Sequence, residues 1–205
     1  MNKPAETERP IHALLQGRWS PRAFSSRIVE PDKLLRLFEA ARWSPSGGNT
    51  QPWAFIVVTR ADGAILDQLV AALMGRNPLW AGNAPVLALS VAKPSRPGTP
   101  INRFSYYDVG QAVAHLSLQA EALGLRVHQM AGYDASKARA LFNLPEETEP
   151  MTLIAIGYEG SVEDLHTELR ERETERRTRK PINEFVFGGG WDQPLRLAEG
   201  ESAEA

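Results

Sequence analysis

The sequence contains no cysteine, so disulfide bonds, thiolate catalysis and cysteine-ligated metals are excluded. It also lacks a long apolar run, because strings such as residues 54–58 fall far short of the roughly 20 residues of a membrane-spanning helix. No apolar signal-peptide segment stands near the beginning, and we expect a cytoplasmic protein with no membrane partner. The four histidines, at positions 12, 115, 128 and 166, form no His-x-x-x-His pair, which predicts that no metal is bound.

A strong excess of one charge is absent as well. The formal net charge is −2, with 23 basic and 25 acidic residues, so we expect no nucleic-acid partner. Gly-x-Gly-x-x-Gly, P-loop and Gly-x-Ser-x-Gly motifs are missing too. A nicotinamide nucleotide, if the protein uses one, is therefore not held by a Rossmann fingerprint.

What is present is typical of one globular domain: 205 residues, 42% of them hydrophobic, with no repeat at a period of about 20 to 50 residues. Residue patterns predict helices at 11–19, 31–44, 62–74, 108–123 and 136–142, and strands at 54–59, 85–91, 125–130 and 152–156. The strand at 85–91 barely alternates between apolar and polar residues. We expect it to be buried on both faces of a sheet.

The helix at 108–123 carries a narrow apolar stripe that suits tight packing, and we expect it to pair with an equal helix of a second chain. The stripe consists of Val109, Val113, Leu116, Ala120 and Leu123.

The end of the chain differs in composition from the rest. Residues 159–180 hold 13 charged residues in 22, so we expect a solvated helix or a mobile segment there. Apolar residues follow this segment and are expected to pack against a surface: Phe185, Val186, Phe187 and Trp191. An apolar tail after a polar connector is typical of a segment exchanged between two chains. The expected organisation is a flexible N-terminus at 1–10, a core at 11–158, a charged connector and C-terminal arm at 159–192, and a flexible tail at 193–205.

Two arginines and a hydroxyl stand close together in the segment Arg18–Phe24. Arg18, Ser20 and Arg22 flank a proline turn, and arginine offers planar donors that suit a phosphate group. This pattern favours an anion clamp, with a solvated basic loop as the alternative. The cluster 176–180 is a second basic run, weak evidence on its own.

The segment Ser44–Trp53 is rich in glycine and side-chain amides. Gly47 and Gly48 allow close approach of the backbone to a ligand, and Asn49 and Gln51 add donors and acceptors on short side chains. A ligand-binding loop is the favoured interpretation, and a plain turn is the alternative.

Three motifs occur in a fixed order: Arg-x-Ser-x-Arg-x-Phe at 18–24, Ser-Pro-Ser-x-x-Asn-x-Gln-Pro-Trp at 44–53, and basic-Pro-x-x-Glu-Phe-Val at 180–186. Together they resemble the FMN-dependent nitroreductase family over residues 11–190. The resemblance implies an α+β homodimer with a mostly antiparallel sheet flanked by helices. It also implies a long central helix at the dimer interface and a C-terminal arm exchanged with the partner.

The resemblance also implies a cofactor site for FMN at the subunit interface. Arg18 and Ser20 correspond to phosphate and ribityl contacts, and Arg22 to the cation beside flavin N1 and the C2 carbonyl. Met130, Ala131 and Gly132 correspond to backbone amides near flavin N5 and O4. The remaining candidates are Trp19 in the first motif, Pro45, Ser46, Asn49 and Gln51 in the loop that reaches the flavin from the other subunit, Asn77 at the ring edge, and Arg177 and Arg179 on the phosphate.

The activity implied is reduction of nitroaromatics, quinones or similar small acceptors by NAD(P)H in a two-step flavin cycle, with no side chain acting as nucleophile or named as general acid. Trp19 stands where a second basic residue or histidine is common, and Trp80 stands near the position of a flavin-facing lysine. Both departures bear on the choice of substrate. One alternative is a relative that uses reduced FMN for oxygen-dependent or dehalogenating chemistry, with residues 93–107 as its lid. Another is a flavin-binding protein without turnover.

Overall fold

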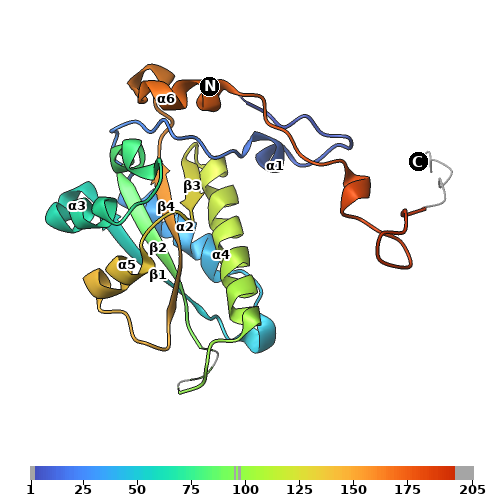
Figure 1. The fold of residues 1–205 in the computed structure, drawn as a ribbon, viewed down its shortest axis with the longest axis horizontal. Coiled ribbons are helices and arrows are strands. Elements are labelled where there is room, and N and C mark those ends of the chain that lie inside the picture. The colour runs from blue at the N-terminus through green and yellow to red at the C-terminus, as the bar shows by residue number, and fades with distance from the viewer. Residues whose placement is uncertain (1–2, 95, 97, 197–205) are drawn as a thin grey trace. The chain divides into compact units, whose positions relative to one another are not determined.

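The computed structural model describes residues 3–94, 96 and 98–196 (Figure 1). The helices are α1 (Ala13–Gly17), α2 (Pro31–Arg42), α3 (Ala64–Ala71), α4 (Arg103–Ala122), α5 (Ala135–Phe142) and α6 (Thr167–Thr174). The strands are β1 (Trp53–Thr59), β2 (Val86–Ala92), β3 (Arg126–Met130) and β4 (Glu149–Gly157). Every strand expected from the sequence is present, and β4 begins three residues earlier than expected.

The four strands form one antiparallel sheet in the order β1-β2-β4-β3. All seven residues of β2 are buried, which confirms the prediction that this strand is covered on both faces. Side chains alternate along it: Leu87 and Leu89 belong to one core, while Val86 and Ala88 belong to the other. This alternation is the period of two expected of a strand, with both faces apolar.

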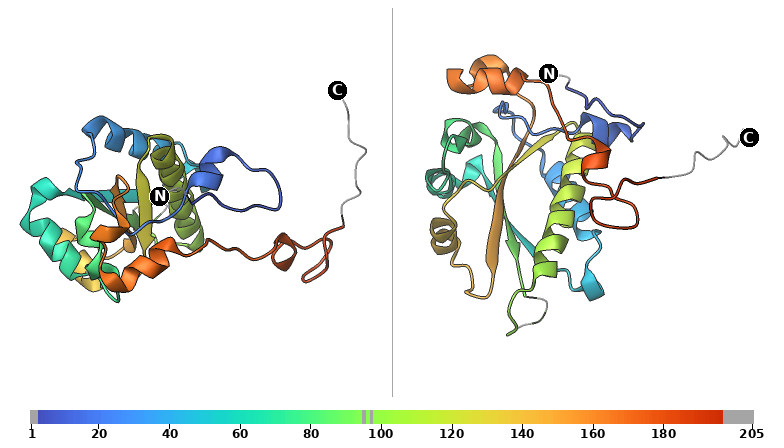
Figure 2. Two further views of the ribbon diagram at one scale, coloured as in Figure 1. Left: turned by 90° about the horizontal axis from the view of Figure 1, so that it is seen from above. Right: turned by 45° about the vertical axis from the view of Figure 1, so that its right-hand side comes forward.

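Helices cover both faces of the sheet, so the first part of the chain has three layers (Figures 1 and 2). The core containing Leu37 of α2 and Leu116 of α4 lies on one face. The core containing Leu69 of α3 and Ala138 of α5 lies on the other, together with Trp80. The structure therefore has the expected α+β arrangement with an antiparallel sheet.

The long helix α4 begins at Arg103, five residues before the expected start. Asn102 caps it, because its side-chain oxygen accepts hydrogen bonds from the backbone N–H groups of Phe104 (2.9 Å) and Ser105 (3.1 Å). The apolar period begins only at Val109, since Phe104 and Tyr107 are exposed and add nothing to the buried stripe.

The buried stripe of α4 packs inside its own chain. Val109, Val113, Leu116 and Ala120 are all buried in the core shared with α2 and the sheet. The expectation that this stripe pairs with an equal helix of a second chain is therefore wrong, because the intramolecular core already uses it. Any partner must meet a different face of α4.

The charged segment after β4 is not entirely solvated. Leu165 and Leu169 of this region are buried in the core that contains Trp80, and Glu173 of α6 is only 1% exposed. The expectation of a solvated helix therefore fits most of α6, whose other residues are exposed, but not Leu169 and Glu173. Leu169 and Glu173 stand four positions apart in α6, which places both on one helix face.

The chain divides into two compact units, one through Glu175 and one from Arg176 onward. The second unit contains a 3-10 turn at Ile182–Glu184, and the rings of Phe187 and Trp191 lie 5.3 Å apart in it. Phe185 and Trp191 remain largely exposed. Residues 197–205 of the expected flexible tail lie outside the described residues.

Candidate functional site

The residues Arg18–Arg22, here called the N-terminal clamp, follow α1 in a proline-containing turn. Arg18 Nη1 donates a hydrogen bond to Ser20 Oγ at 3.3 Å, so two of the predicted anion-binding groups lie together. Arg18 and Ser20 are half-buried, as is the Arg22 guanidinium, which is 20% exposed. The donor set of two guanidinium groups and a hydroxyl matches the chemistry of a phosphate-bearing ligand.

Trp19 of the clamp is buried and lies beneath the ammonium group of Lys3, which is 4.8 Å from the ring centroid. Its indole N–H has no hydrogen-bond partner among the described residues. Buried donors are normally satisfied, so this group calls for an acceptor from a ligand, a water or another chain. The structure thus leaves an unused donor within the clamp.

His128 on β3 contacts the backbone of the clamp at Pro21. Its Nδ1 lies 2.8 Å from the carbonyl oxygen of Pro21, so Nδ1 carries the proton and donates it, and its ring centroid is 4.5 Å from that of Trp80. Burial, assisted by the positive charges of Arg22 and Arg18, lowers the pKa of His128 from 6.5 to about 4. The imidazole is neutral at physiological pH and acts as a fixed support.

Glu173 contacts the clamp from the end of α6. Its Oε1 accepts hydrogen bonds from the backbone N–H of Arg22 (2.7 Å) and of Ala23 (3.0 Å), while Oε2 lies 3.4 Å from Arg22 Nη1. Sequence reasoning missed both Glu173 and His128. Glu173 stands in a run of charged residues, and nothing in the local sequence marks it as the buried one.

A second group of predicted residues gathers where β3 ends. Asn77 Nδ2 donates to the Gly132 carbonyl at 2.9 Å, Met130 is buried, and Ala131 and Gly132 are exposed. A Cβ at Gly132 would lie 2.9 Å from Asn77 Nδ2, so a side chain there would displace the Asn77 amide. The strand β3 links this group to His128 and therefore to the N-terminal clamp.

Trp80 belongs to the core and not to the exposed part of the site. It is 1% exposed and packs against Phe24, with ring centroids 6.1 Å apart, and against His128. Its indole ring therefore supports the clamp from the core side.

Most of residues 45–51 in the amide-rich loop are exposed, whereas Ser44 and Pro52 are buried, and the loop is held together by its own side chains. Ser46 Oγ accepts from the backbone N–H of Gln51 at 3.1 Å, and Gln51 Nε2 donates to Asn49 Oδ1 at 3.1 Å. Gly48, Asn49 and Gln51 all have positive φ angles, between 47° and 57°. Pro45 is exposed in the same loop. Left-handed backbone at two non-glycine residues is the kind of strain found where a loop binds a ligand.

This loop is fixed to α4 by two contacts. The backbone N–H of Gly47 donates to Asp108 Oδ2 at 3.0 Å, and Ser44 Oγ is hydrogen-bonded to His115 Nδ1 at 2.8 Å. The N-terminal clamp follows α1, which packs at the other end of α4: a Cβ at Gly17 would lie 2.7 Å from Glu121 Oε1. At a rise of about 1.5 Å per residue, Asp108 and Glu121 are about 20 Å apart along the helix. Within one chain, the glycine turn of the loop and the helix that precedes the clamp are therefore attached at separate points along α4.

The outward face of α4 carries small residues between these two ends. Gly110 and Ala114 are exposed, as is Tyr107 one turn earlier. A Cβ added at Gly110 would meet no described atom within 4 Å, so packing within the described chain does not require glycine there. Small residues on an exposed helix allow another backbone to approach closely.

The two predicted tail cations belong to the second unit. Arg179 Nη1 donates to the carbonyl oxygen of Thr178 at 2.7 Å, and Arg177 is half-buried. They are therefore not among the site residues that the first unit gathers. Nor do the described residues contain a cluster of three or more His, Asp or Glu side chains able to hold a metal.

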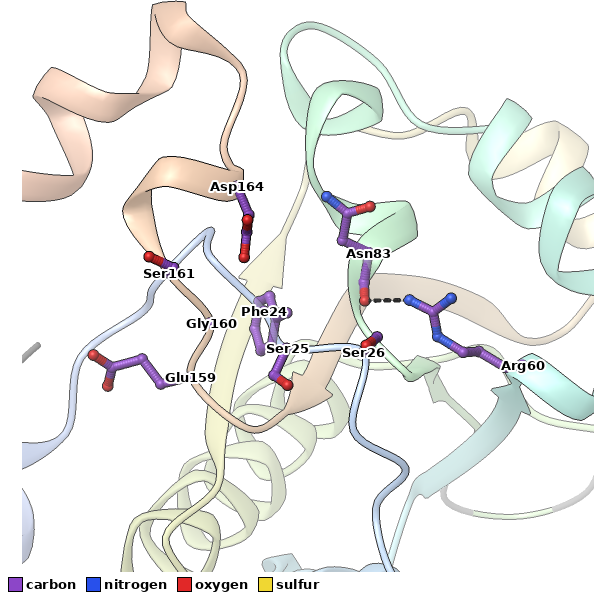
Figure 3. Close-up of a pocket in the computed structure, with 9 residues that line it drawn as sticks. All are labelled: Phe24, Ser25, Ser26, Arg60, Asn83, Glu159, Gly160, Ser161 and Asp164. Carbon is purple, nitrogen blue, oxygen red and sulfur yellow. Dashed lines mark hydrogen bonds between the residues drawn. The ribbon is translucent and has the colours of Figure 1, made fainter.

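A polar cleft of about 500 Å³ opens beside the segment that follows the clamp (Figure 3). Arg60 at its edge donates through Nη2 to the carbonyl oxygen of Asn83 at 2.6 Å. The cleft is lined by Phe24, Ser25, Ser26, Arg60, Asn83, Glu159, Gly160, Ser161 and Asp164. Phe24 is the last residue of the first motif, but none of the lining residues is among the predicted cofactor contacts.

The fold is α+β, with an antiparallel sheet flanked by helices, and the candidate site segments are attached along one long helix. Residues 15–158, more than half of the sequence, match the Nitroreductase family, and the chain belongs to that family. Among the helices of the described residues, none is long and apolar enough to cross a membrane.

Known proteins agree with this assignment. The solved structure of an oxidoreductase containing FMN is 30% identical, with a TM-score of 0.80, and the match covers 91% of this chain and 95% of that one. An Archaeoglobus fulgidus protein named "Putative NADH dehydrogenase/NAD(P)H nitroreductase" is 27% identical over 75% of this chain and 87% of its own length. A Mycolicibacterium smegmatis protein, the 15.4 kDa protein of the ask 5′ region, is 32% identical over 45% of this chain. That match spans 63% of the relative, less than two thirds of its length.

Proposed function

We propose that this chain is an FMN-dependent oxidoreductase that uses NAD(P)H to reduce nitroaromatics, quinones or similar small electron acceptors. We further propose that it works as a homodimer with FMN held between the two chains. The observation that carries the proposal is the separation of two ligand-binding segments to opposite ends of α4. Family membership and the FMN named in the similar oxidoreductase support the choice of cofactor.

The two-chain site follows from the symmetry of a dimer. When two α4 helices pack antiparallel about a twofold axis, the N-terminal end of one lies beside the C-terminal end of the other. The loop carrying Ser46 and Asn49 in one chain then approaches the N-terminal clamp of its partner. The exposed Gly110 and Ala114 suit this close packing, and they replace the buried stripe that the sequence suggested.

Within one subunit, each part of the site has a role that its chemistry allows. Arg18 and Ser20 bind the phosphate and ribityl groups, and Trp19 has a buried N–H to offer. Arg22 places positive charge on the N1 side of the ring. The backbone at Met130, Ala131 and Gly132 faces the N5 and O4 side.

The remaining candidates complete the site from its edges. Asn77 holds the turn at Gly132 and borders the ring. Pro45 and Gln51 frame the partner loop, and Arg177 and Arg179 add positive charge to the phosphate from the exchanged arm. Phe185 and Trp191, which are largely exposed in the second unit, supply the apolar surface that holds that arm on the partner.

When bound, FMN supplies the redox chemistry, accepting two electrons from a nicotinamide and passing them to an acceptor. The protein contributes a fixed cation at Arg22, where negative charge develops, and the neutral His128 beneath the clamp keeps that geometry rigid. No side chain is assigned as nucleophile or general acid.

The test is purification followed by analysis of cofactor and oligomeric state. We expect a yellow protein that releases about one FMN per chain on heating, is dimeric by light scattering, and is bleached anaerobically by NADH or NADPH. A colourless protein that fails to bind added FMN would overturn the cofactor. A yellow protein that neither nicotinamide bleaches would be a flavin-binding protein without turnover. A monomeric, yellow and active protein would overturn the two-chain site.

A further inference from the structure

Glu173 is a buried carboxylate that serves the N-terminal clamp. Its side chain is 1% exposed, although it comes from α6, 151 positions after Arg22. It accepts the backbone N–H groups of Arg22 and Ala23 with one oxygen and faces the Arg22 guanidinium with the other. These three contacts hold both the backbone and the side chain of the residue assigned to flavin N1.

The energetics of this position exclude a role in packing alone. A buried carboxylate is costly unless it is paired and hydrogen-bonded, and an apolar side chain would fill the same space at lower cost. A negative charge in the last turn of a helix is also unfavourable with the helix dipole. Leu169, one turn earlier on the same face, shows that an apolar residue is accommodated there. The carboxylate is therefore explained by what it does to Arg22 and Ala23.

We propose that Glu173 is a positioning residue for the flavin site: it fixes Arg22 in the clamp and, through its negative charge, holds down the reduction potential of the bound flavin. This inference rests on the proposed FMN function. Glu173 offsets part of the positive charge of Arg22, so the clamp stabilises the added electrons less than a lone arginine would. The acidic residue thereby keeps the bound flavin a stronger reductant.

The sign of the effect separates this role from a structural one. In Glu173→Gln, the amide oxygen can still accept from the two backbone N–H groups, but the negative charge is gone. At an effective dielectric constant of about 20, a unit charge within about 12 Å changes an equilibrium by roughly tenfold. For a two-electron couple, tenfold corresponds to about 30 mV. We therefore expect the reduction potential of the bound flavin to rise by about 30 mV. A simple loss of structure would weaken FMN binding but would not raise this potential.

The experiment measures the potential of bound FMN by equilibration with a reference dye, and FMN affinity by fluorescence titration. The matched control is Glu171→Gln, which removes the same charge from an exposed position of the same helix. A higher flavin potential in Glu173→Gln, with no change of potential in Glu171→Gln, supports the proposal. An unchanged or lower potential in Glu173→Gln overturns it, and so does an equal rise in both variants.

A second variant keeps the test decisive if Glu173→Gln does not fold. Glu173→Asp retains the charge but shortens the reach to the clamp, and we expect FMN to bind on the order of tenfold more weakly with little change in potential. Wild-type affinity in this variant would overturn the positioning role. Wild-type protein that binds no FMN at all would overturn the proposed function, and this role with it. If the wild type binds FMN normally and both Glu173 variants keep its FMN affinity and flavin potential, only the role of Glu173 is overturned.

Discussion

Replacing His128 with asparagine should remove a large part of the acid sensitivity of the fold. The imidazole is buried between Pro21 and Trp80 and is neutral in the folded protein, with its pKa lowered from 6.5 to about 4. An unfolded chain protonates this group near its ordinary pKa, so the unfolded state binds more protons between pH 6.5 and pH 4. Stability is therefore lost as the pH falls through that window and is fully present above it.

The pKa shift sets the size of the effect. Two and a half pKa units correspond to about 3 kcal/mol at full protonation, of which about 2 kcal/mol is lost between pH 7.5 and pH 5. The asparagine side chain that replaces the imidazole can still donate to the Pro21 carbonyl but does not titrate. The variant should start less stable at pH 7.5, because it loses the contact with Trp80, and should then lose about 2 kcal/mol less than wild type on going to pH 5.

Urea unfolding of flavin-free protein at fixed protein concentration, at both pH values, measures this difference. His166→Gln is the control, since it removes a histidine from an exposed position. Parallel loss of stability in wild type and His128→Asn would refute the reasoning. It would mean that the imidazole is solvated in the folded state and that it does not support the clamp as described.

Two further predictions concern the flavin site and the arm. Arg22→Met preserves bulk but removes the cation, so it should lower the potential of the bound flavin and slow its reduction by NAD(P)H in anaerobic stopped-flow; wild-type rates with FMN bound would make Arg22 a structural residue. Deletion of residues 181–205 removes Phe185 and Trp191, whose burial is worth on the order of 1.5–3 kcal/mol each if they cover a partner. The truncated chain should associate more weakly by light scattering and lose FMN absorbance at the same time, and a truncated dimer that keeps its flavin would rule out an exchanged arm.

The strands could be predicted from the sequence because β-branched and apolar runs are local signals. Residues 85–91 barely alternate, and β2 is buried throughout. The start of α4 was harder to predict, since its first turns carry exposed aromatic residues and the signal that matters is the cap at Asn102. The use of the apolar stripe at Val109 and Leu116 was misassigned, because a periodic stripe shows that a helix face is buried but not which chain covers it.

The motifs of the candidate site could also be predicted, whereas their supports could not. The clamp and the amide-rich loop are compact in sequence, so their unusual composition is visible. Glu173 and His128 act on the clamp from more than 100 positions away. Only the packing of α6 and β3 reveals that one acid in a charged run, and one histidine without a metal-binding partner, are buried against Pro21 and Arg22.

The attachment of the clamp and the loop to opposite ends of α4 has a genetic consequence. If each catalytic centre combines the clamp of one chain with the loop of the other, a chain defective only in its clamp and a chain defective only in its loop can repair each other. A mixed dimer of the two would contain one centre with both defects and one centre with none. Two inactive alleles expressed together would then restore part of the activity, as in interallelic complementation, although neither restores it alone.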